Sequence, residues 1–517
     1  MIIRSPYPDV TIPEIPLPEL ILRQTERLAD KPALIDGPSG RTLTYGQFGA
    51  GVRQVAAGLA ARGFGRGQVF GIYCPNVPEY ALAFHGVVLS GGTNTTVNPL
   101  YTVPELVKQL NDCKARFLLT VPMFLENALA AAQETDVEEV FVLGEGEGAT
   151  SFQELMRSGP LPEVEYDVRN DLVVLPYSSG TTGTPKGVML THFNLVANIL
   201  QFQDLEPTGE ADTLIGILPF FHIYGMTVIM NAALSNGATI VTLPRFDLEQ
   251  FLKTLQDYRI TRAHVVPPIV LALAKHPLVS QFDLSSLRTI MSGAAPLGEE
   301  LSRECAQRLN VLMKQGYGMT ELSPVSHVTP DEPEKVVYGS AGVALPNTEC
   351  KIVDVSSGEA QEVGARGELC IRGPQVMAGY LNNPEATAET IDADGWLHTG
   401  DIAEVDAQGY FRIVDRVKEL IKYKGFQVAP AELEALLVSH SEVADAAVVP
   451  YSDEEAGEVP RAFVVRQAGS SVTEEELLAF VAEQVAPYKK VRRLEFTDQI
   501  PKSASGKILR RVLRDQP

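Results

Sequence analysis

Residues 172–190 read LVVLPYSSGTTGTPKGVML, an apolar run followed by a loop rich in glycine, serine and threonine and by a second apolar run. A Walker A phosphate loop reads G-x-x-x-x-G-K-[ST] and opens a helix. Here Gly180, Gly183 and Lys186 have the spacing G-x-x-G-x-x-K, and the β-forming residues after Lys186 predict a strand instead of a helix. The stretch therefore predicts a loop between two strands that is not a Walker A loop.

The composition of this loop still favours an anion as its ligand. Glycines allow several backbone amides to point toward one anion, and the loop adds hydroxyl donors and the positive charge of Lys186. A flexible hairpin rich in serine and glycine, without a ligand, is the alternative. We expect a phosphate-binding loop.

Similar apolar runs recur on both sides of the loop. Runs such as 68–74, QVFGIYC, and 115–121, ARFLLTV, alternate with amphipathic stretches such as 45–63 and 103–114. Short apolar runs that alternate with amphipathic helices are typical of an α/β protein with largely parallel sheets. We expect a large N-terminal domain with two mostly parallel sheets flanked by helices.

The pattern changes twice toward the C-terminus. From about Gly339 to residue 415, short strands and glycine-rich turns predict a small distorted barrel within the large domain. Beyond it, a new alternation of helix and strand patterns predicts a small α+β domain. We place the large domain at 1–417 and the small domain at 418–517.

Composition and charge exclude several classes of protein. The formal net charge of −22 over 517 residues disfavours nucleic acid as a partner, because most of the surface would repel a polyanion. Asparagines and glycines interrupt the most apolar stretch, 223–243, so we expect a buried helix and strand and no membrane span. Neither end of the chain resembles a secretory or peroxisomal signal, which predicts a cytoplasmic protein. We expect the protein to be a monomer or a homodimer.

The cysteines predict neither a disulfide framework nor a zinc site. No two of the five are spaced as C-x-x-C, and an odd, dispersed set is typical of reduced thiols in a reducing compartment. They are Cys74, Cys113, Cys305, Cys350 and Cys370.

Five motifs together resemble those of the adenylate-forming enzymes. They are YSSGTTGTPKGV (177–188), GYGMTE (316–321), GWLHTGD (395–401), DRVKELIKYKGFQVAPAELE (415–434) and PKSASGKILRR (501–511). Within that superfamily the set looks most like the 4-coumarate–CoA ligases and related acyl-CoA synthetases. The resemblance implies a ligase that uses ATP, Mg²⁺ and coenzyme A to convert a carboxylic acid to its adenylate and then to its thioester.

The resemblance also implies a nucleotide site built from both predicted domains. The phosphate-side residues would be Ser178, Ser179, Gly180, Thr181, Thr182, Gly183 and Lys186. The adenine, ribose and α-phosphate would contact Ala294, Gln315, Gly316, Tyr317, Thr320, Asp401, Arg416, Lys418, Lys422 and Lys507. Thr181 and Glu321 would supply oxygen ligands to Mg²⁺, a hard cation.

Four of the implied residues would act on the reacting groups. Lys507 would reach the α-phosphate and the substrate carboxylate. The other predicted catalytic residues are His222, Lys422 and Gln427. In the resembling enzymes the small domain is mobile and turns between the two half-reactions, which implies a hinge near Lys418. The coenzyme A side would then involve Arg245, Lys424 and Gly425.

The acyl pocket implied by the resemblance is mostly apolar. Its members would be Tyr224, Val228, Met291, Ala294, Gly316, Pro324 and Val325. Such a lining suits a planar aromatic acid such as a cinnamate, or an aliphatic chain, and disfavours a charged side group. Leu322-Ser323 stands where plant coumarate ligases more often have Ala-Gly, so the sequence alone leaves the acid open.

Three other functions fit parts of the same motif set. An adenylating enzyme could load a carrier protein, and a luciferase-like oxidoreductase could use the same adenylate. A non-catalytic nucleotide-binding protein would be expected to have lost Lys507 or the glycine-rich loop, and both are intact.

Overall fold

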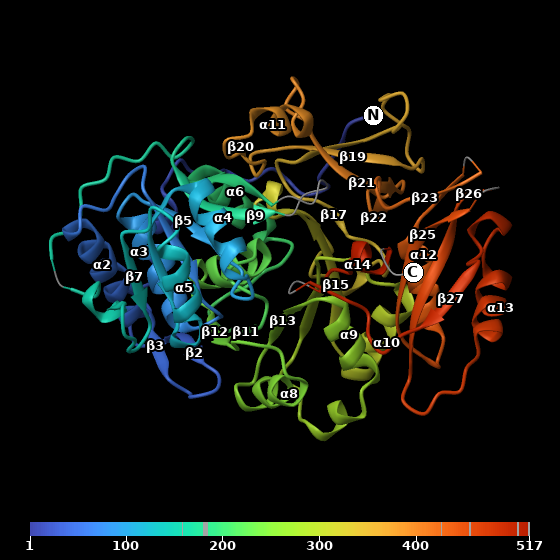
Figure 1. Cartoon of the computed structure of the whole chain (residues 1–517), viewed down its shortest axis with the longest axis horizontal. Helices are drawn as coiled ribbons and strands as arrows, with labels where there is room; N and C mark the ends of the chain where they lie inside the picture. The colour runs from blue at the N-terminus through green and yellow to red at the C-terminus, as the bar shows by residue number, and fades with distance from the viewer. Residues whose placement is uncertain (158, 179–184, 425, 454–455, 504–505, 515–517) are drawn as a thin grey trace.

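The computed structural model describes residues 1–157, 159–178, 185–424, 426–453, 456–503 and 506–514 (Figure 1). Ser179, Gly180, Thr181, Thr182, Gly183 and Gly425, all predicted site residues, lie outside the described residues. The backbone of Gln427 lies within a strand, and its side chain is outside the description.

One sheet carries the strands that flank the glycine-rich loop. Its order is β20 (Gly379–Tyr380), β10 (Lys186–Thr191), β9 (Leu172–Ser178), β5 (Thr93–Thr96), β4 (Val69–Tyr73), β6 (Ala115–Thr120), β7 (Glu139–Val142) and β8 (Thr150–Ser151). From β9 to β8 the neighbours are parallel, whereas β10 is antiparallel to β9 with Lys186 opposite Ser178. The predicted placement of the loop between two strands is confirmed.

A second, larger sheet is also mainly parallel. Its order is β17 (Val343–Ala344), β16 (Val325–Val328), β15 (Leu312–Gly318), β14 (Thr289–Ser292), β13 (Arg262–Val265), β11 (Thr213–Gly216), β12 (Thr239–Thr242), β2 (Pro32–Asp36) and β3 (Thr42–Thr44). The strands from β15 to β2 are parallel, and antiparallel strands close both edges. The predicted α/β class is confirmed.

The two remaining sheets are smaller. An antiparallel sheet runs β1 (Ile3–Arg4), β18 (Glu349–Val353), β19 (Gly367–Arg372), β21 (Leu397–Val405) and β22 (Phe411–Arg416) and corresponds to the predicted barrel. The C-terminal sheet runs β24 (Phe426–Val428), β23 (Ile421–Tyr423), β26 (Gly457–Arg466) and β25 (Val443–Asp453), with β27 (Arg493–Phe496) beside β26. Figure 1 shows the C-terminal sheet beside the antiparallel one.

The helices are α1 (Leu17–Leu22), α2 (Tyr45–Ala61), α3 (Pro78–Leu89), α4 (Val103–Cys113), α5 (Leu125–Ala132), α6 (His192–Gln203), α7 (Ala232–Ser235), α8 (Leu248–Asp257), α9 (Pro267–Lys275), α10 (Glu299–Leu309), α11 (Pro384–Thr390), α12 (Pro430–Ser439), α13 (Glu474–Gln484) and α14 (Arg510–Arg514). Capping boxes begin several of them. Thr44 with Gln47 begins α2, and Thr191 with Asn194 begins α6 directly after β10.

The packing separates the C-terminal region from the rest. One large hydrophobic cluster joins residues of both mainly parallel sheets, and another of its own joins residues between Ile421 and Leu494. A separate core supports the predicted boundary near Lys418, which remains a prediction. All five cysteines are free and buried, and in the described part of the chain no helix is long and apolar enough to cross a bilayer.

Candidate active site

A cavity of about 1210 Å³ opens where the two mainly parallel sheets, the antiparallel sheet and the C-terminal region meet. Its lining runs in sequence from Thr96 to Arg514, so widely separated segments build one site. The volume lies above the usual range for a drug-sized ligand, about 300–1,000 Å³, and can hold a nucleotide with a second substrate.

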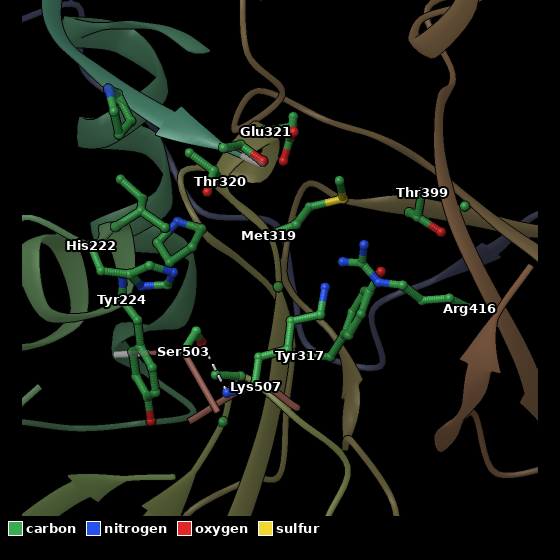
Figure 2. Close-up of a pocket in the computed structure, with 18 of the residues that line it drawn as sticks. His222, Tyr224, Tyr317, Met319, Thr320, Glu321, Thr399, Arg416, Ser503 and Lys507 are labelled. Carbon is green, nitrogen blue, oxygen red and sulfur yellow. Dashed lines mark hydrogen bonds between the residues drawn. The ribbon is translucent and has the colours of Figure 1, made fainter. Parts of the chain in front are cut away.

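Most of the described residues predicted for the site line this cavity. They are Ser178, Lys186, His222, Tyr224, Val228, Met291, Ala294, Gly316, Tyr317, Thr320, Glu321, Pro324, Val325, Arg416, Lys418 and Lys507. Figure 2 shows the Lys507 side chain extending into the space between His222 and Arg416, next to Tyr317.

Asp401 lies directly behind the lining. Its carboxylate accepts a hydrogen bond of 2.6 Å from the Tyr317 hydroxyl, and its Oδ1 is 3.4 Å from Nε of Arg416. The pairing of β21 with β22 places Asp401 opposite Arg416, so strand register sets this contact. Burial raises the pKa of Asp401, and the positive charge of Arg416 opposes that shift.

Glu321 lies at the other end of the GYGMTE motif. It is buried, and its carboxylate accepts a hydrogen bond of 2.8 Å from the Tyr380 hydroxyl, whose ring centroid lies 5.2 Å from Nζ of Lys186. A carboxylate oxygen at a cavity wall fits the predicted Mg²⁺ ligand chemistry. Thr181, the other predicted ligand, is outside the described residues.

Lys507 comes to the cavity on a loop of the small C-terminal region. The Ser503 hydroxyl accepts a hydrogen bond from the Lys507 backbone N–H at 3.1 Å, and the Ser503 N–H donates to the Lys507 carbonyl at 2.8 Å. Gly506 has φ +79°, and a Cβ there would lie 3.0 Å from Cγ2 of Val266, which directly follows β13 of the large sheet. Glycine therefore lets the loop pack on the large domain, in the arrangement predicted to serve acid activation.

The charge of Lys507 predicts a pH dependence. Burial, with repulsion from Arg416, lowers the pKa of Lys507 to about 8, although Asp401 favours the cation. The lysine is positive below that pH and loses its charge above it. We expect kcat/KM for adenylate formation to fall as the pH rises through about 8, because kcat/KM reports the free enzyme.

A Lys507→Arg variant is the control for this pH limb. The guanidinium stays charged at every accessible pH, so the alkaline fall should disappear even though the different geometry lowers the rate. An unchanged fall near pH 8 in the variant would assign it to another group.

The side of the cavity predicted to hold the acyl group includes a π-helix over Tyr224–Asn231, which carries Tyr224 and Val228. Just before it, Nδ1 of His222 accepts a hydrogen bond of 3.3 Å from the Tyr224 backbone N–H. Burial lowers the pKa of His222 to about 4, so the imidazole is neutral at pH 7. A Cβ at Gly293 would lie 2.8 Å from Cε1 of Tyr224, so glycine makes room for this ring.

The structure adds residues that the sequence prediction missed. Phe202, Glu206 and Val328 also line the cavity, so the expected mostly apolar wall includes a carboxylate. Arg262 Nη1 donates to Glu206 Oε1 at 2.9 Å, and the Lys314 ammonium contacts the other oxygen. Burial opposes ionisation of Glu206, but Lys314 and its neighbours hold its pKa well below the usual range.

Some predicted residues lie outside the cavity lining. The side-chain amide of Gln315 makes two hydrogen bonds with the Leu297 backbone. Its oxygen accepts from the Leu297 N–H at 3.1 Å, and its nitrogen donates to the Leu297 carbonyl at 3.2 Å, so Gln315 shapes the loop after Ala294. Lys422, Lys424 and Arg245 are exposed. Their predicted roles in the two half-reactions remain predictions.

Two protein-family models together match most of the chain. Residues 21–381 match the model for AMP-binding enzymes, and residues 432–507 match that for the C-terminal domain of AMP-binding enzymes. The chain belongs to the AMP-binding enzyme family. It is 46% identical to 4-coumarate–CoA ligase 2 of Petroselinum crispum over 525 residues, which cover 99% of this chain and 96% of the relative.

Solved structures of similar proteins share the fold. An anthranilate CoA ligase in complex with anthranoyl-AMP superposes with a TM-score of 0.89 at 28% identity, covering 97% of this chain and 96% of its own. A benzoate CoA ligase from Burkholderia xenovorans gives a TM-score of 0.88 at 26% identity, covering 97% of this chain and 100% of its own.

Proposed function

We propose that the protein is an ATP-dependent carboxylate–CoA ligase that acts on an aromatic acid. The observation that carries this proposal is the meeting of Lys507 with Tyr317, Arg416 and the His222–Tyr224 wall in one cavity. A nucleotide α-phosphate and a carboxylate could react at that point. The 4-coumarate–CoA ligases among the relatives support the same reaction class.

In the first half-reaction a carboxylate oxygen attacks the α-phosphorus of ATP. The bond from the α-phosphorus to the bridging oxygen breaks, and pyrophosphate leaves with the electron pair. Two unit charges 4 Å apart repel by about 4 kcal/mol at an effective dielectric constant near 20. The Lys507 ammonium lowers this barrier because it stands where negative charge accumulates.

The remaining residues position the reactants. Glu321, with Thr181, would hold Mg²⁺, which neutralises phosphate charge when bound. The neutral His222 shapes the wall beside the acyl group and is not needed as a base, since carboxylic acids are already ionised at pH 7.

In the second half-reaction the sulfur of coenzyme A attacks the acyl carbonyl carbon. The bond from that carbon to the AMP oxygen breaks, AMP leaves, and the thiol proton passes to solvent. We propose that Lys424, Gly425 and Arg245 meet coenzyme A after the small domain has turned about Lys418, and that Lys422 and Gln427 serve the other orientation.

The Glu206 side chain indicates which class of carboxylic acid the cavity would favour. The Glu206 carboxylate at the cavity wall can accept a hydrogen bond from a donor on the substrate, which a terminal methyl group cannot supply. This supports an aromatic acid with a hydroxyl far from its carboxylate over a fatty acid.

The buried free cysteines support a cytoplasmic location.

A substrate panel tests both the reaction and the acid. We expect pyrophosphate release and a CoA thioester with 4-hydroxycinnamate, less with 4-methoxycinnamate, and least with decanoate. In Glu206→Gln the preference for the hydroxy over the methoxy acid should fall about 10-fold or more, as expected for losing a hydrogen bond to a charged group.

Unsubstituted cinnamate is the internal control for folding of this variant, and its rate should change little. A decanoate rate above every aromatic acid would contradict the proposed substrate. Adenylate that forms but never passes to coenzyme A would favour the carrier-protein or oxidoreductase alternatives.

A further inference from the structure

Three side chains with different ligand atoms converge on the antiparallel sheet. Cys370 of β19 pairs in register with His398 of β21, and Glu368 lies two residues before Cys370 on the same face. Sγ of Cys370 lies 3.5 Å from Nδ1 of His398, which lies 3.0 Å from Oε2 of Glu368. The three ligand atoms all lie within 4.8 Å of one another.

These separations fit one small coordination sphere. Zinc bond lengths of about 2.3 Å to sulfur and about 2.0–2.2 Å to nitrogen and oxygen place tetrahedral ligands about 3.3–3.6 Å apart. The sulfur–nitrogen separation of 3.5 Å lies in that range, and the nitrogen–oxygen separation of 3.0 Å is slightly shorter. A small rotation of the Glu368 side chain would lengthen the distance between its oxygen and the His398 nitrogen.

The outer contacts are also those of a metal site. Nε2 of His398 faces Oδ2 of Asp392 at 3.6 Å, and the second oxygen of Glu368 accepts the Gly400 N–H at 3.0 Å. Histidine ligands commonly give their second ring nitrogen to a carboxylate, which fixes the tautomer and the ring orientation. The convergent nitrogen of His398 is therefore Nδ1.

An ion could enter from the cavity. Glu368 and His398 both line it, whereas Cys370 is buried behind them. Three protein ligands with an open fourth position toward solvent leave room for a water ligand.

We propose that Glu368, Cys370 and His398 bind Zn²⁺ or a similar divalent transition metal ion, with Asp392 as the outer partner of the histidine. The thiol binds as a thiolate and releases its proton to solvent. Sulfur and imidazole ligands disfavour Mg²⁺, which prefers oxygen, so this site is distinct from the proposed Mg²⁺ position at Glu321. A bound ion ties β19 to β21 three residues before Asp401.

The chain contains a matched control pair. Sγ of Cys350 lies 3.5 Å from Nε2 of His327, the same separation as in the proposed site, and both residues are 0% exposed. Glu368, Cys370 and His398 form the only such group of three in the described part of the chain, so Cys350 and His327 lack a converging third ligand there. They provide a thiol and an imidazole without a metal site.

Cobalt(II) is the probe, because a cobalt–thiolate bond gives charge-transfer absorption in the near ultraviolet. The purified full chain, treated with chelator and a reductant without thiols, is titrated with Co²⁺ and then with Zn²⁺ as competitor. Trp396, the only tryptophan, packs in one cluster with Cys370 and provides a second signal through its fluorescence.

We expect one Co²⁺ per chain with charge-transfer absorption and quenching of Trp396. Cys370→Ser should abolish the absorption and weaken Zn²⁺ competition at least 10-fold, whereas Cys350→Ser should change neither. Asp392→Asn, which keeps all three ligands, should weaken binding about 10- to 100-fold. Absence of thiolate absorption in the wild type, or equal loss in Cys350→Ser, would overturn the proposal.

Discussion

Replacing Lys507 by alanine should slow acyl-adenylate formation about 100-fold or more and leave thioester formation from supplied acyl adenylate within a few-fold of wild type. Removing one preorganised charge or donor from a developing anion commonly lowers the rate about 10²–10³-fold. Lys507 lies near Asp401 and Arg416 in the cavity, where the α-phosphate is proposed to bind. The second half-reaction uses another orientation of the small domain, so it should not need this lysine.

Lys502→Ala is the matched control for this result. Lys502 belongs to the same loop region, but its ammonium is paired with Asp445 at 2.5 Å and does not line the cavity. Both half-reactions should keep their wild-type rates in this variant. Equal loss of both half-reactions in Lys507→Ala would contradict the proposal that each orientation of the small domain serves one half-reaction.

Replacing Lys314 by methionine should lower the free energy of unfolding by about 3–5 kcal/mol, because the carboxylates of Glu206 and Asp331 lose one of the buried cations that pair with them. The Lys314 side chain is 0% exposed, and its ammonium donates to Asp331 at 2.9 Å and to the Leu205 carbonyl at 2.7 Å and contacts Glu206. Methionine has a similar length, so most of the loss would come from charge. Denaturant unfolding measures it.

Lys335→Met is the control variant, because it removes the lysine of an exposed ion pair instead of a buried one. Lys335 also pairs with a glutamate, Glu332 at 2.8 Å, but both side chains are 42% exposed. An exposed ion pair contributes little to stability because solvent screens it, so this variant should unfold nearly as wild type does. Similar losses in both variants would contradict the buried-charge interpretation.

A double variant sharpens the same test. Glu206→Gln combined with Lys314→Met also removes the charge of one of the two buried carboxylates that lose the lysine cation in the single variant. The double variant should therefore lose less stability than the sum of the two single variants, as expected for residues in one network. Additive losses would show that the two side chains act independently.

Local sequence chemistry predicted much of the fold. The hairpin around the glycine-rich loop follows from β-forming residues on both sides of it, and β9 and β10 pair there. The change of pattern near residue 339 matches the antiparallel sheet. Most of the described residues predicted from the motif resemblance line the cavity, from Ser178 to Lys507, but they make up only about a third of its lining.

The charged cluster at the predicted acyl wall could not be predicted in this way. Glu206, Arg262 and Lys314 are far apart in the sequence, and the side-by-side order of β13, β14 and β15 brings the last two together. Hydrophobic periodicity identifies which face of an element is buried, but not which buried charges will pair. The lysine within the buried run VLMKQ, residues 311–315, was the available signal.

The same limit applies to strand register and helix type. The contact of Asp401 with Arg416, and that of Cys370 with His398, depend on which residues stand opposite one another in neighbouring strands. The sequence of 223–243 predicted a buried helix and strand, but its pattern did not indicate that the helix over Tyr224–Asn231 is a π-helix.

The most direct test of the central claim is the amount of pyrophosphate released by the enzyme before coenzyme A is added. With ATP, Mg²⁺ and 4-hydroxycinnamate, we predict a burst of about one pyrophosphate per enzyme, because the acyl adenylate stays bound, followed by steady turnover when coenzyme A is added. No pyrophosphate before coenzyme A, or release of inorganic phosphate and ADP instead, would contradict activation through an acyl adenylate.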